Sequence, residues 1–329
     1  MSANAYKTEL RESILSLLWR QWVGVGIAGH GQGLAVGTVV DPEALIIITS
    51  VFARYDQRLY DLMLDWLSVY GALINTTRLK ALVNRCKYKD KVSVGYIAAH
   101  CERNGDKRWS RLASEYGCQQ ATPEYLFISA DGDCTDYVKA SDSLALQYGF
   151  IRNAYERQNK LLRCIPESDS SLLLRLRGLF GVNARADVFL LLLQGAMSLQ
   201  QLADGCGYTR GAVIEILKEW ELSHVISRIP YSAKRDMYRL NHTEFIKNYY
   251  GVDTVLYPAW SSVFEAIVAL WQLVSQPALQ KVSDTTFRGE LSLLYQEQMV
   301  PSLSRCGIKT FADLSEQSLL ELPLLLDTL

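Results

Sequence analysis

The sequence predicts a mainly helical protein that carries one small β-hairpin. Apolar residues recur at three- and four-residue steps over most of the chain. Two short strand-like runs, Val225–Ile229 and Met237–Leu240, are separated by a polar loop of hairpin length. With 329 residues and 49% hydrophobic composition, the chain is long enough for two or three domains, each with its own core.

The charge balance excludes a globally basic nucleic-acid binder. The chain has 34 Lys and Arg residues and 35 Asp and Glu residues, so any attraction to phosphate must be local. The seven cysteines include no C-x-x-C pair, which argues against zinc and favours reduced thiols. The N-terminal residues lack the apolar core of a secretory signal, and the longest apolar run, 44–53, is about half of the ~20 residues that a membrane helix needs. We therefore expect a soluble, cytoplasmic protein with no membrane partner.

Residues 1–117 are predicted to form a helical N-terminal domain. Helical spacing is found over Leu10–Trp22 and again over Leu59–Tyr70. Asp41, followed by a proline, and Asn75 are each typical of a residue that caps the start of a helix. The stretch from 78 to 111 is strongly basic, which fits either additional phosphate contacts or a solvated helical face.

Residues 118–170 are predicted to be a linker followed by a connecting helix. The acidic segment at 131–136 lacks the glutamate that closes a calcium-binding loop, so we expect an irregular, solvated connection there. One short strand is predicted at Tyr125–Ile128. The spacing over Leu144–Ile165 predicts a long helix.

The most informative segment spans residues 171–245. An apolar helix is predicted over Asn183–Gln194, Ser198 caps a second helix, and Thr209 caps a third over Arg210–Trp220. The strand-like runs and their basic loop follow directly. Three helices followed by a strand, a basic loop and a strand are the elements of a winged helix-turn-helix, in which the third helix enters the major groove of DNA.

This segment resembles the winged-helix regulators of the ArsR and MarR type, over about one fifth of the chain. The resemblance is carried by the stretches Phe180-Gly-x-x-Ala-Arg-Ala-x-Val188, Ser198-Leu-x-x-Leu-Ala203 and Tyr208-Thr-Arg-x-x-Val213. It implies that the third helix approaches DNA with Thr209 and Arg210. It also implies that Lys234 and Arg235 reach the DNA backbone from the wing and that Arg185 lies near a phosphate.

Position along the predicted third helix adds further candidates, because some residues fall at its leading end or opposite its apolar face, where a major groove can accept them. Among these, Glu215 could accept a hydrogen bond from a cytosine amino group. The complete set of candidate DNA-binding residues is Arg185, Tyr208, Thr209, Arg210, Ala212, Glu215, Lys218, Lys234 and Arg235.

We expect a transcriptional repressor that binds double-stranded DNA, most naturally as a homodimer that presents two recognition helices to two half-sites. The local charge leaves an alternative open. Glu215 and Glu219 are acidic residues on a helix that should be basic if it reads DNA. The segment from Arg175 to Leu240 has nine basic and six acidic residues, which is only a small positive excess. The same fold could therefore serve as a protein-assembly module that contacts a protein partner in a larger complex. Residues 246–329 are predicted to be a helical segment that either closes the core or pairs two protomers.

No enzyme, cofactor or metal is expected. Gly24–Gly29 matches G-x-G-x-x-G, but a helix is predicted before it and a strand, Gly33–Val40, after it, which is the wrong context for a dinucleotide. The four histidines lie far apart in the sequence and none belongs to a catalytic or metal-binding motif.

Overall fold

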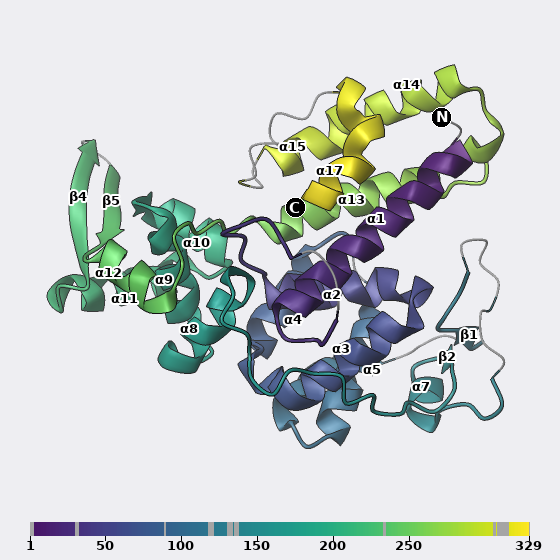
Figure 1. The fold of residues 1–329 in the computed structure, drawn as a ribbon, viewed down its shortest axis with the longest axis horizontal. Coiled ribbons are helices and arrows are strands. Elements are labelled where there is room, and N and C mark those ends of the chain that lie inside the picture. Colours follow the sequence, from purple (N-terminus) through teal and green to yellow (C-terminus); the bar gives the residue numbers. More distant parts are fainter. Residues whose placement is uncertain are drawn as a thin grey trace.

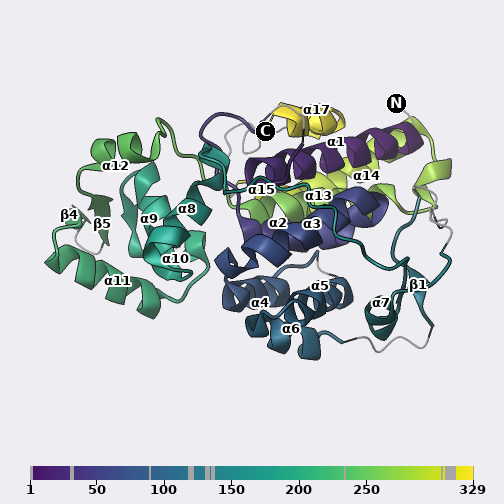
Figure 2. The ribbon, with the colours of Figure 1, turned by 60° about the horizontal axis from the view of Figure 1, so that its bottom comes forward.

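The computed structural model is mainly helical, with one small antiparallel sheet (Figure 1). It describes residues 3–29, 33–88, 90–117, 122–129, 134, 138–232, 235–304, 307 and 316–328. Residues 172–250 form a unit at one end of the molecule, which we call the module, and the remaining helices form a larger unit, which we call the body (Figures 1 and 2).

The body is organised around its long first helix, which packs against α-helices from both halves of the chain. The side chains of Trp22 and Trp66 are fully buried in the body and are in edge-to-face contact. The helices of the body are α1 (Ala3–Gly24), α2 (Pro42–Phe52), α3 (Gln57–Tyr70), α4 (Thr76–Arg85), α5 (Lys91–Arg103), α6 (Ser110–Glu115), α7 (Ser143–Gln147), α13 (Trp260–Val274), α14 (Asp284–Leu294), α15 (Val300–Leu303) and α17 (Leu322–Thr328), with a π-helical turn at Tyr295–Met299.

Side-chain caps begin the helices of the first half of the body. Asp41 accepts a hydrogen bond from the backbone N–H of Ala44 (3.1 Å), and Asn75 accepts one from that of Arg78 (3.0 Å). Each bond satisfies a backbone donor that has no partner within the helix. Both predicted helix starts are confirmed.

The helices that follow the module pack against the N-terminal ones. Trp260 at the start of α13 donates to the carbonyl of Val39 (2.8 Å), and α17 packs along α1. The side chain of Arg20 donates to the carbonyl of Leu326 (2.6 Å) near the end of α17, where helical carbonyls lack partners of their own. This segment therefore closes the core around α1, which is one of the two roles that the sequence left open.

Two predictions for the connecting segments are wrong. Residues 144–165 do not form a long helix: α7 ends before Gly149, whose φ of +73° is left-handed, and β2 (Phe150–Ile151) pairs in parallel with β1 (Glu124–Tyr125). Asp65 then accepts hydrogen bonds from the backbone N–H groups of 158 and 159 (2.8 and 2.9 Å), so a contact with α3 replaces helical bonding. Residues 33–40 form no regular strand, only an isolated bridge between Thr38 and Leu256. The acidic segment at 131–136 lies almost entirely outside the described residues.

The module contains the predicted helices and hairpin. Its three strands form an antiparallel sheet in the order β3, β5, β4, with Ile226 opposite Leu240 and Arg228 opposite Tyr238. Ser198 and Gln201 make a reciprocal capping box at the start of the second of the predicted helices. The elements of the module are α8 (Leu172–Phe180), α9 (Ala184–Gln194), β3 (Met197–Ser198), α10 (Leu199–Cys206), α11 (Arg210–Leu222), β4 (Ile226–Ser232), β5 (Arg235–Leu240) and α12 (Thr243–Tyr250).

Candidate functional site

A buried ionic cluster joins the module to the body. Glu43, in the first turn of α2, accepts hydrogen bonds from Arg78 of α4 (2.6 Å) and from Arg177 of α8 (2.6 and 2.9 Å). Arg78 also donates two bonds to Asp41 (2.7 and 2.6 Å), and Arg177 lies 3.4 Å from Asp187 of α9. All five side chains are buried. Bidentate guanidinium–carboxylate pairing of this kind fixes orientation as well as separation.

The charges in this cluster do not balance. Two guanidinium groups face three carboxylates, so full ionisation leaves one negative charge in a buried site. Burial raises the pKa of Asp187 to about 6, against the opposing effect of Arg177 and Arg78. Burial also acts to raise the pKa of Asp41, but its contacts with Arg78 outweigh burial and hold that pKa below its usual value. Asp187 therefore takes up a proton more readily than Asp41, and one proton makes the cluster neutral.

The turn between α10 and α11 is attached to α4 of the body. Arg78 donates from Nε to the carbonyl of Cys206 (3.1 Å), the last residue of α10. Two residues later, the hydroxyl of Tyr208 accepts a hydrogen bond from the amide of Asn75 (2.6 Å). Tyr208 is thus half-buried against the body, and its hydroxyl is engaged there. The hydroxyl of Tyr208 is thus directed toward the body, and a role of Tyr208 in base recognition stays a prediction.

The helix α11 has one packed face and one exposed face. Its packed face places Val213, Ile216, Leu217 and Trp220 in the core of the module. Its N-cap is Thr209, whose hydroxyl accepts from the N–H of Ala212 (3.3 Å), as predicted. Ala212 is exposed, as is Arg210 in the first turn. No described residue forms a hydrogen bond or an ion pair with the Arg210 side chain.

Other candidate residues are engaged in local ion pairs. Arg185, at the start of α9, pairs with Glu219 of α11, and Lys218 pairs with Glu215 (2.8 Å) within α11. These four side chains are at least one-third exposed, so the pairs are solvated and each stabilises the fold only slightly. On the outer face of α11, Arg210 is therefore the cation that remains open to a ligand.

The β4–β5 hairpin lies beside α11. Arg228 of β4 pairs with Asp236 of β5, whereas Arg239 is exposed and has no ion-pair partner in the described part of the chain. Of the two predicted residues at the tip, Arg235 begins β5 and Lys234 lies outside the described residues.

The glycine-rich stretch serves packing. Gly24 ends α1, and a Cβ there would lie 2.8 Å from the Cβ of Ser170, so a larger residue would collide with the segment that leads into α8. Ile27 forms a bridge with Leu161. Between Val25 and Val40 the described residues, which leave out 30–32, include no start of a helix, so they do not provide the helix N-terminus that cradles a phosphate.

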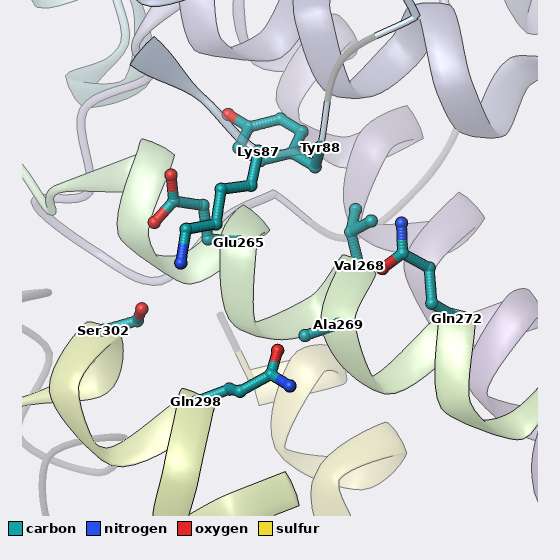
Figure 3. Close-up of a pocket in the computed structure, with 8 residues that line it drawn as sticks. All are labelled: Lys87, Tyr88, Glu265, Val268, Ala269, Gln272, Gln298 and Ser302. Carbon is teal, nitrogen blue, oxygen red and sulfur yellow. The ribbon is translucent and has the colours of Figure 1, made fainter.

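A small cavity lies in the body, between α13, the π-helical turn and the segment after α4 (Figure 3). Its volume is about 80 Å³. Its polar lining includes Lys87, Glu265 and Gln298, and no lining residue belongs to the module. Over the described ranges, no group of three His, Cys, Asp or Glu side chains is arranged to hold a metal ion, and no helix is both long and apolar enough to cross a bilayer.

The sequence patterns did not indicate the ionic cluster. Asp41 stands out only as a helix cap, and its partners are spread from Glu43 to Asp187 with no fixed spacing. A charged residue within an otherwise apolar helix, as Asp187 is, was the one available signal. No protein-family model, no curated protein and no solved structure matches this chain.

Proposed function

We propose that the module is a winged helix-turn-helix and that the protein binds double-stranded DNA as a transcriptional regulator. The proposal rests mainly on α11, which packs one face into the core and leaves the other to solvent, with an unpaired arginine, Arg210, in its first turn. A helix exposed in this way fits a major groove, and a guanidinium can bond to guanine or to phosphate there.

The hairpin supports the same proposal. In this fold the β4–β5 hairpin is the wing, and the exposed Arg239 supplies positive charge on β5. Basic side chains at such a position neutralise phosphates and fix the register of the protein on the duplex.

We further propose that two copies act together as a cytoplasmic repressor. The helix α11 carries two basic and three acidic residues, so one copy has little electrostatic attraction for DNA. A two-fold pair would present two such helices to half-sites about 34 Å apart and would double the contacts.

A second candidate function is protein assembly, and it is favoured by apolar side chains exposed on the module. Leu222 at the end of α11 is 85% exposed, and Phe245 and Tyr249 on α12 are 72% and 74% exposed. The residues that follow α11 and precede α12 are joined by a hydrogen bond from the Asn241 amide to the carbonyl of His224 (2.7 Å). Large exposed aromatic residues are typical of surfaces that contact another protein.

Fluorescence polarisation distinguishes the two functions. The purified protein is titrated against the duplex from upstream of its own coding sequence and against a scrambled duplex, each at two salt concentrations. For DNA binding we expect tighter, salt-sensitive binding to the upstream duplex and its loss in Arg210→Ala. Arg288→Ala is the control, since Arg288 is exposed on α14 at the other end of the molecule.

Absence of salt-sensitive binding to either duplex would refute DNA binding. If Leu222→Ser and Phe245→Ser then abolish capture of a specific protein partner while Leu324→Ser, at another exposed leucine, does not, the assembly function is supported.

A further inference from the structure

A second arginine, supplied by the body, lies against the turn that leads into α11. The guanidinium of Arg85, in the last turn of α4, is 3.5 Å from the position that a Cβ would occupy on Gly207. Gly207 has a φ of +74° and ends α10. Figure 2 shows α4 at the edge of the body that faces α10 and α11.

Arg85 and Arg78 are seven residues apart on α4, which is about two helical turns, so both leave the same side of the helix. Arg78 is buried, bonds to the carbonyl of Cys206 and is neutralised by carboxylates. Arg85 lies beside the next residue of the turn, Gly207, and is exposed. Both arginines thus lie against the same turn. The buried Arg78 is paired with carboxylates, whereas the exposed Arg85 is not.

The charge of Arg85 has no partner among the described residues. The closest acid along α10, Asp204, accepts hydrogen bonds from Gln200 instead (2.7 and 2.6 Å). Arg210, three residues beyond Gly207, is also unpaired. Arg85 lies against Gly207 and Arg210 begins the helix that follows, so two guanidinium groups without a charged partner adjoin one turn in a chain of net charge -1.

We propose that Arg85 contacts a backbone phosphate of the same duplex that α11 enters, so that the DNA-binding surface is composed of both the module and the body. This inference rests on the proposed function. A guanidinium beside the start of a recognition helix meets the sugar–phosphate backbone rather than base edges, because the bases face the helix itself. Arg85 therefore contributes affinity and no sequence preference.

Salt titration tests this role. The dissociation constants of the wild type, Arg85→Ala, Arg85→Lys and the control Arg288→Ala are measured on the upstream and scrambled duplexes over a range of salt concentrations. For Arg85→Ala we expect weaker binding to both duplexes by the same factor, and a salt slope reduced by about 1. Arg85→Lys keeps the charge and should keep the slope.

The outcomes separate the two proposals. If the wild type binds the upstream duplex in a salt-sensitive manner but Arg85→Ala behaves like Arg288→Ala, the role of Arg85 is refuted and the proposed function stands. If Arg85→Ala weakens binding to the upstream duplex alone, Arg85 reads bases and the phosphate assignment is refuted. If the wild type binds neither duplex, both proposals fail.

Discussion

The guanidinium of Arg177 donates two hydrogen bonds to the carboxylate of Glu43, and both side chains are completely buried. This pair joins the first helix of the module to the start of α2 in the body. The module is therefore attached to the body by buried ion pairs as well as by apolar packing.

Replacing Arg177 with methionine should destabilise the protein strongly. The change leaves three buried carboxylates with one guanidinium, and breaking a buried pair in this way costs about 3–5 kcal/mol. Urea unfolding at pH 8 measures the effect. The control is Arg175→Met on the same helix, where the partly exposed arginine bonds to the carbonyl of Tyr250 and about 1 kcal/mol is expected. Equal losses in the two variants would contradict the role given to the cluster.

The stability of the protein should depend on pH through Asp187. The pKa of Asp187 is about 6 in the folded protein and 3.8 in the unfolded chain, so the folded state binds the proton more tightly. Stability from this group is therefore full below about pH 4, falls as pH rises to about 6, and is absent above, a change of about 3 kcal/mol. Asp187→Asn should remove this component, as measured by urea unfolding between pH 4.5 and 7.5. Parallel pH profiles of the variant and the wild type would show that Asp187 does not titrate in this range.

Two glycines in helices should respond oppositely to alanine. At Gly95 in α5, a Cβ would overlap the carbonyl oxygen of Tyr116, so Gly95→Ala should destabilise by about 1–3 kcal/mol or more. At Gly289, inside α14, a Cβ would meet nothing within 4 Å. Gly289→Ala should stabilise by about 0.5–1 kcal/mol, since alanine favours the helix. Thermal unfolding of both variants checks the signs, and a stabilising Gly95→Ala would refute the close approach of α5 to Tyr116.

Removing Glu219 should strengthen DNA binding under the proposed function. Glu219→Gln takes a negative charge from α11 and releases Arg185, which can then contact a phosphate. We expect tighter binding and a salt slope that is steeper by about 0.9, as for one added phosphate contact. Glu12→Gln removes a comparably exposed carboxylate from α1 and should change neither quantity. Unchanged binding in Glu219→Gln would place Glu219 and Arg185 away from the duplex.

Local signals in the sequence predicted the local structure well. The caps at Asp41, Asn75 and Thr209 and the hairpin were recognisable because each depends on a few neighbouring residues. The long helix expected at 144–165 failed because Asp65, far away in the sequence, bonds to the backbone of that segment. The contact of Tyr208 with Asn75 and the position of Arg85 beside Gly207 could not be predicted for the same reason, because spacing along one helix does not show what packs against it.

The packing of α13 and α17 on α1 bears on how the protein is made. The last helix of the module ends at Tyr250, whereas α17, the last helix that packs on α1, begins at Leu322. At about 5–20 residues per second, roughly 15–60 s of translation separate α1 from α17. During that time α1 exposes an apolar surface, so a nascent chain that has already folded its module would still be a substrate for chaperones that bind hydrophobic helices.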